Sequence, residues 1–175
     1  MRSPLKLRAL SVRQPWAWAI IHAGKDIENR GHVAIWKGAM KPGGRIAIHA
    51  SKGMTKCDYI EGYNFMRSLG ILCPPAGALI RGAVIGSVEV TDIVTKSASP
   101  WFFGPRGLVL RDPEPCEPIA AGGQLGFFVW SPGGEIEQPL KWMQPKPDAR
   151  HPVELQAEAD LFKQLTTCHR PEGER

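Results

Sequence analysis

The segment GKDIENR, residues 24–30, brings together three side chains that could do chemistry. Lys25, Glu28 and Arg30 come directly after an apolar run that Gly24 ends. If a strand begins after this turn, alternation places Glu28 and Arg30 on the same face of it. A lysine, a carboxylate and an arginine at the rim of a domain can form a polar pocket. The same spacing is typical of an ordinary surface ion pair, and the spacing alone favours that simpler interpretation.

The preceding stretch SVRQPWAW supplies a second group of candidates. Arg13 and Gln14 come just before a predicted helix, so they and the free N–H groups of its first turn can face an anion or a base edge. Trp16 and Trp18 are too close in the helix for both to point into the core. One of them can therefore stack on a base, a contact of about 1–3 kcal/mol in single-strand binders. In the alternative, both pack between helix and barrel, and we prefer this for Trp16.

A third group lies in the proline-bounded loop SASPWFFGP, which contains Trp101, Phe102 and Phe103. Aromatic residues in loops often carry binding functions. A loop that folds back over the end of a barrel is the alternative.

Two helices are predicted to position these groups. Pro15 stands at a first helical position and Gly24 just past the end, which predicts a helix of about nine residues. Its core face would carry Trp16, Ala19, Ile20 and Ala23. The segment TKCDYIEGYNFMRSLG has apolar residues at helical spacing and predicts a second helix that ends at Gly70.

The rest of the pattern is that of β-strands. GGRIAIHAS alternates, which predicts a strand with one polar side that carries Arg45, His49 and Ser51. ALIRGAVIGSVEVTDIV, GLVLRD and LGFFVW read as further strands, with the proline-rich PEPCEP as a separator. The fold class predicted is α+β, a small bent β-barrel of about five to six strands with two or more flanking helices.

Composition excludes several classes of protein. With 43% apolar and 22% charged residues the chain is an ordinary globular sequence, and no apolar run is long enough to span a bilayer. The N-terminus lacks the apolar core of a secretion signal, so we expect a cytoplasmic protein without membrane association. The 4 cysteines and 5 histidines lack the spacing of metal ligands, so neither a metal nor another cofactor is predicted.

Charge is divided unevenly along the chain. Residues 1–56 hold eleven Lys and Arg against two acids, whereas residues 57–130 and 131–175 each carry a net charge of −2. A basic segment attracts polyanions such as nucleic acid, although a solvated basic face is the commoner explanation of a single charge run.

Several motifs together resemble one known family. LSVRQPWAWAIIHAGKDIENR, GRIAIHAS, GAVIGSVEVTDIV, SPWFFGPRGLVL and GQLGFFVW occur in the order of an ASCH domain (activating signal cointegrator homology), a barrel of the PUA-like superfamily. The resemblance covers about residues 10–130. It implies a cleft between the first helix, the following turn and the barrel edge, in a superfamily whose members bind RNA or modified bases. The residues carried over to that cleft are Arg13, Gln14, Pro15, Trp16, Lys25, Glu28, Arg30, His49, Ser51 and Trp101.

The resemblance also implies two enzymatic alternatives. Some relatives are amidohydrolases that deacylate the exocyclic amine of cytidine with a Lys, a Thr and a Glu. Lys25 matches that lysine, but Glu28 stands where the threonine would be, so here Lys25 and Glu28 would have to activate water. Other ASCH proteins are ribonucleases, in which His49 beside Lys25 could serve acid–base cleavage.

The leading prediction is a nucleic-acid-binding domain over residues 1–130 that holds single-stranded RNA or a modified base, with the small hydrolase as the alternative. A domain that binds a peptide or metabolite is a third possibility. Residues 131–175 are predicted to form a proline-rich extended arm and a short helix near 153–166, and this acidic tail could cover the cleft. Protein partners and RNA versus DNA stay open.

Overall fold

The computed structural model describes residues 7–31 and 43–144 and shows one strongly curved sheet. Its strands lie in the order β2-β5-β4-β3-β1-β6, and β1 runs parallel to β3 while the other pairs are antiparallel. The predicted α+β barrel of five to six strands with flanking helices is confirmed. The strands are β1 (Ala9–Val12), β2 (Ile27–Arg30), β3 (Gly44–Ala50), β4 (Ala83–Val94), β5 (Arg106–Ala120) and β6 (Phe127–Phe128).

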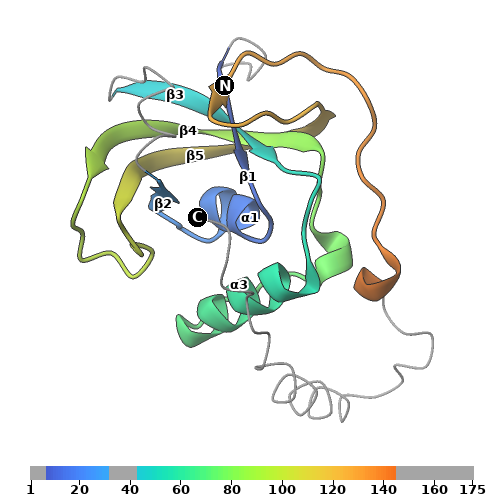
Figure 1. Ribbon diagram of the computed structural model, residues 1–175, viewed down its shortest axis with the longest axis horizontal. Helices are drawn as coiled ribbons and strands as arrows, with labels where there is room; N and C mark the ends of the chain where they lie inside the picture. Colours follow the sequence, from blue (N-terminus) through green and yellow to red (C-terminus); the bar gives the residue numbers. More distant parts are fainter. Residues whose placement is uncertain (1–6, 32–42, 145–175) are drawn as a thin grey trace.

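The first helix, α1 (Trp16–His22), lies in the concave side of this sheet (Figure 1). Pro15 precedes it and Gly24, at φ 67°, turns the chain out of it, as the sequence predicted. The helix is shorter than the nine residues expected. Ala19 and Ile20 of the predicted stripe are buried, whereas Trp16 and Ala23 are only partly buried. Because the sheet curves around the helix, Ala17 and Ile21 are buried as well.

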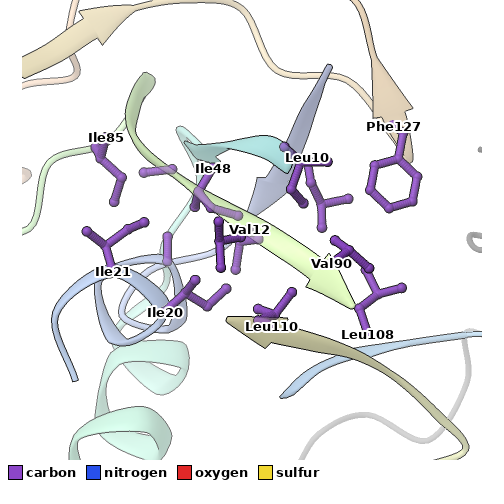
Figure 2. Packing of buried hydrophobic residues seen from close by; sticks show 14 residues of the cluster. Leu10, Val12, Ile20, Ile21, Ile48, Ile85, Val90, Leu108, Leu110 and Phe127 are labelled. Carbon is purple, nitrogen blue, oxygen red and sulfur yellow. The ribbon is translucent and has the colours of Figure 1, made fainter. Parts of the chain in front are cut away.

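The main core forms between α1 and the inner face of the sheet. Figure 2 shows Ile20 and Ile21 of α1 directed toward strand residues such as Ile48 and Leu110. Phe127 completes the same cluster at the β6 end. This packing fixes the position of α1, and with it the turn that follows the helix.

The second helix, α3 (Lys56–Ser68), begins with a capping box in which Thr55 and Asp58 bond reciprocally. It ends before Gly70, at φ 75°, so this helix prediction is confirmed. Gly62 packs on Pro15, where an added Cβ would lie 2.4 Å from Cγ of the proline. The glycine therefore allows α3 to approach the start of α1.

The alternation predicted for β3 is confirmed, but its polar side is not open to solvent. Ala47 and His49 point away from the main core, yet both have no exposed surface. A second apolar cluster covers this face, because the chain after β5 folds back over it with Ala121, Phe128 and Trp130. Arg45, near the start of the strand, is the charged residue of this face, and its side chain is 15% exposed.

The proline-rich PEPCEP does not separate two strands, as expected, but lies inside the long strand β5. Only residues 106–109 of β5 pair with β2, so the later part pairs with β4 alone. A strand with one free edge tolerates prolines, and three register shifts in the β4–β5 pair accommodate the remaining irregularity.

The structure describes the predicted arm only as far as residue 144, and residues 135–140 of it lie in neither helix nor strand. It packs along the barrel on the side away from β2 (Figure 1). Arg81 donates to the Gln138 carbonyl at 2.6 Å, and Met143 is buried beside the short helix η2 (Ala76–Ala78). Met143 belongs to a second short helix, η3 (Lys141–Met143). The helix predicted near 153–166 lies outside the described residues.

In the part of the chain that the structure describes, no helix has the length and apolar character needed to cross a membrane.

Candidate functional site

Lys25, Glu28 and Arg30 form one charged cluster at the end of the curved sheet. The turn after α1 places Lys25 so that its backbone N–H donates to the Ala19 carbonyl. Its Nζ donates to Glu28 Oε2 at 2.8 Å and to the Ile27 carbonyl. The Lys25 side chain is 2% exposed and that of Glu28 10%, so this is a buried pair and not a surface one.

Arg30 joins this cluster to the opposite end of the sheet. One of its guanidinium nitrogens lies 3.0 Å from Glu28 Oε1 and donates to the Ser11 carbonyl at 2.7 Å. Ser11 belongs to β1, which lies four strands away from β2 in the sheet order. At this point the curved sheet is therefore closed by a hydrogen bond from the Arg30 side chain of β2 to β1, and not by backbone pairing between the two strands.

The cluster has more positive than negative charge. Two cations, Lys25 and Arg30, share the single carboxylate of Glu28. Arg30 Nε is buried and has no hydrogen-bond partner among the described residues. A buried donor without an acceptor costs about 1–3 kcal/mol, so a bound acceptor would stabilise this arrangement.

The residues before α1 are held by the protein itself. The buried Gln14 donates through Nε2 to the Ile80 carbonyl at 2.7 Å and accepts at Oε1 from the Trp18 N–H at 2.9 Å. Arg13 is paired with Asp58 at 3.0 Å. Gln14 therefore anchors the start of α1, and its amide is not available to a ligand.

Trp16 and Trp101 meet in an aromatic cluster with Phe65 and Phe103. Trp16 lies 5.8 Å from Phe65 and 6.3 Å from both Trp101 and Phe103, measured between ring centroids. Trp101, the loop residue expected to close the cleft, is only 4% exposed and forms part of the core, whereas Phe103 is 58% exposed. The exposed ring of this cluster therefore belongs to Phe103.

Asn29 positions the aromatic loop and was missed by the sequence interpretation. Its Nδ2 donates to the Trp101 carbonyl at 2.8 Å, and its Oδ1 accepts from the Phe103 N–H at 2.8 Å. In the sequence, strand alternation places Asn29 on the face opposite Glu28 and Arg30, which indicates that its side chain has different partners. Those partners could not be predicted, because they lie more than 70 residues away in the chain.

His49 and Ser51 are not brought to the charged cluster. His49 Nε2 lies 3.0 Å from the Ala121 carbonyl, which only accepts, so Nε2 carries the proton and Nδ1 accepts from the Ser11 hydroxyl at 3.0 Å. Burial lowers the pKa of His49, with a smaller lowering from Lys52, against the raising effect of the Ala121 hydrogen bond. Ser51 donates to the Gly53 carbonyl at 3.3 Å. Neither residue contacts Lys25.

The excess charge of residues 1–56 is partly neutralised by acids from the rest of the chain. Besides the Arg13 pair, Arg45 lies 3.3 Å from Glu114 and Lys52 lies 2.9 Å from Glu137. Among the described residues, no three side chains of His, Cys, Asp or Glu gather in a way that could hold a metal ion.

An open groove of about 560 Å³ lies elsewhere, under the arm. It is lined by Lys52 and residues 135–140, and none of the candidate site residues contributes to it. The groove and the charged cluster are therefore separate features.

The fold is that of a small α+β half-barrel with a buried charged cluster at its open seam. No family model and no curated protein matches the chain. Among solved structures, it is similar to a mutant of ZmASCH from Zymomonas mobilis, at 18% sequence identity and a TM-score of 0.36, over 91% of this chain and 99% of that chain. At this level of similarity, the function has to be argued from the chemistry of the site.

Proposed function

We propose that this protein is a cytoplasmic nucleic-acid-binding domain of the ASCH type, which holds single-stranded RNA or a modified base at the seam between β1 and β2. The observation that carries the proposal is the charged cluster, in which two cations share one carboxylate and Arg30 Nε has no acceptor among the described residues. A phosphate or a base carbonyl supplies the missing acceptor.

Two further features support this proposal. Phe103 exposes an aromatic ring beside β2, and stacking on such a ring is how many single-strand binders hold a base. The motifs in residues 10–130 resemble those of the ASCH domain, whose superfamily binds RNA and modified bases.

The test is a binding measurement by fluorescence anisotropy, with labelled single-stranded RNA and single-stranded DNA at 50 and 200 mM salt. If about four phosphates are contacted, Kd rises by roughly tens-fold over this range. Arg30→Gln should weaken binding, whereas Arg67→Gln, which removes an exposed charge from α3, should change it little. Circular dichroism on both variants checks that they are folded. A flat salt dependence, or equal effects of the two substitutions, would contradict the proposal.

A second candidate function is hydrolysis of an acylated nucleoside or of RNA. It is favoured by the 2.8 Å contact between Lys25 Nζ and Glu28 Oε2, which joins a proton donor to a carboxylate that could activate water. Against the ribonuclease form, both ring nitrogens of His49 are already hydrogen-bonded within the core.

Mass spectrometry distinguishes the two functions. The protein is incubated with N4-acetylcytidine, RNA and single-stranded DNA, and the products are compared between wild type and Lys25→Ala. Product from the wild type alone makes it an enzyme that uses Lys25. Intact substrates together with salt-dependent binding leave it a binding domain.

A further inference from the structure

Arg106, the first residue of β5, lies directly opposite Arg30 in the antiparallel β2–β5 pair. Residues opposite each other in such a pair project from the same face, with Cβ atoms about 4.5–5.5 Å apart. Two arginines in this position repel each other, and like charges directly opposite destabilise a sheet. An anion bound between the two guanidinium groups would offset this repulsion.

The described protein supplies too little negative charge for this purpose. Glu28 is the neighbour of Arg30 on the same face of β2, and its carboxylate already forms ion pairs with both Lys25 and Arg30. The side chain of Arg106 is half-buried and has no hydrogen bond or ion pair with any described residue. Lys25, Arg30 and Arg106 therefore set three positive charges against the one carboxylate of Glu28, a net charge of +2 for these four side chains.

The loop that carries the exposed ring of Phe103 is attached to the same end of β2 as the arginine pair. Phe103 comes three residues before Arg106, and its backbone N–H is held by Asn29, the neighbour of Arg30 on β2. Asn29 and Arg30 project from opposite faces of the strand, so the ring and the two guanidinium groups flank the same strand end. A ligand that carries a phosphate and an aromatic base could contact both.

We propose that Arg30 and Arg106 form a phosphate-binding subsite, so that the ligand is a nucleotide or a strand and not a free nucleoside. This rests on the proposed function for the identity of the base-bearing ligand. Guanidinium groups bind phosphate through paired, charge-assisted hydrogen bonds, and Arg30 Nε offers a donor that is not yet used by any described residue. Arg106 is the residue that separates phosphorylated from unphosphorylated ligands.

The experiment compares four probes: inorganic phosphate, cytidine, cytidine 5′-monophosphate and a single-stranded RNA. Binding is followed by NMR at the amides of Arg106 and Gly107, and the RNA affinity is measured across salt concentrations. The variant is Arg106→Gln. The control is Arg111→Gln, which removes an exposed arginine from the same strand, opposite Glu89.

In the wild type, the monophosphate should bind about tenfold more tightly than cytidine, because one good charge-assisted hydrogen bond changes Kd by about that factor. Inorganic phosphate should shift the same amides. Arg106→Gln should remove this preference. It should also reduce the slope of log K against log salt concentration for RNA binding by the contribution of about one phosphate contact. Arg111→Gln should preserve both.

The outcomes separate the two proposals. If RNA binds but Arg106→Gln behaves like Arg111→Gln, the phosphate subsite is wrong and the proposed function stands. If phosphate and the monophosphate bind through Arg106 while RNA does not, the subsite stands and the nucleic-acid proposal is wrong. Absence of binding by all four probes overturns both.

Discussion

The imidazole of His49 is held in one tautomer by Ser11 on one side and the Ala121 carbonyl on the other. Because the ring has no exposed surface, the charged form is disfavoured and the pKa lies below its usual value. In the unfolded chain the same ring titrates near pH 6.5. The unfolded state therefore binds more protons as the pH falls below that value.

This linkage predicts how stability depends on pH. The stability contributed by neutral His49 is complete above about pH 6.5 and is lost as the pH falls from there toward the lowered pKa of the folded state. We expect urea unfolding to show a clear loss of stability between pH 7.5 and pH 5.5. In His49→Gln this loss should be smaller, although the variant is less stable at pH 7.5 by about 1–3 kcal/mol because its buried partners are imperfectly satisfied.

His22→Gln is the matched control, because that ring is exposed and lies against Trp18. Its pKa is also lowered, by partial burial, so it should account for a smaller part of the pH dependence. Equal effects of the two substitutions would show that His49 is not the dominant group.

Residue types predicted part of the candidate site. Lys25, Glu28 and Arg30 stood out because charged residues directly after an apolar helix are unusual, and the structure gathers all three. The partners that define their chemistry are distant in sequence. The Ser11 carbonyl that Arg30 meets depends on the curl of the whole sheet, and no local pattern could predict it.

Among the elements, the contact between α1 and α3 depends on one glycine. An alanine at position 62 would raise helix propensity by about 1 kcal/mol in an open helix. Here its Cβ would lie 2.4 Å from Pro15 Cγ, so the two helices would have to separate. We expect Gly62→Ala to lower the free energy of unfolding by about 1–3 kcal/mol, measured by urea denaturation. Gly53→Ala, with nothing within 4 Å of the added Cβ, should be close to neutral.

Asn29 joins β2 to the aromatic loop through two hydrogen bonds. Asn29→Ala removes both, so the backbone N–H of Phe103 loses its acceptor. We expect its amide to exchange faster with solvent by about fivefold or more, since a lost bond of about 1 kcal/mol corresponds to that factor. Asn64→Ala, an exposed site on α3, should leave this exchange rate unchanged. Unchanged exchange in Asn29→Ala would mean that other contacts hold the loop.

At this scale the helices were predictable and the sheet edges were not. Pro15 and Gly24 predicted the first helix, and apolar residues at helical spacing together with Gly70 predicted the second, since these signals act within a few residues. PEPCEP was read as a break because proline cannot donate to a strand ladder. The rule failed because most of β5 has one free edge, which is a property of the strand order and not of the local sequence.

For the whole molecule, the arm after residue 130 acts as part of the packed structure. Arg81 is 3% exposed and donates to the carbonyls of Lys52 and Gln138, while the Glu137 N–H donates to the Arg81 carbonyl. The composition of this segment predicted extended backbone, but prolines carry no information about where such a segment packs. Its buried contacts show that deletion of the arm would expose apolar surface and leave Arg81 without partners.

Met143 tests this role of the arm. It is 5% exposed and packs with Met54, Ala76 and Leu79. We expect Met143→Ala to lower the free energy of unfolding by about 2–4 kcal/mol, as for other buried methionines. Leu140→Ala, at a position that is 48% exposed, should cost less than about 1 kcal/mol. If both substitutions are neutral, the arm contributes nothing to stability.

The position of β1 has a consequence for synthesis of the protein. This strand is synthesised well before β6, yet it lies between β3 and β6 in the finished sheet. Its outer edge stays uncovered until Phe127 and Phe128 have emerged from the exit tunnel. The nascent chain therefore carries an open β-edge from the synthesis of β1 until that of β6, and a ribosome stalled before residue 127 presents that edge to chaperones and to neighbouring chains.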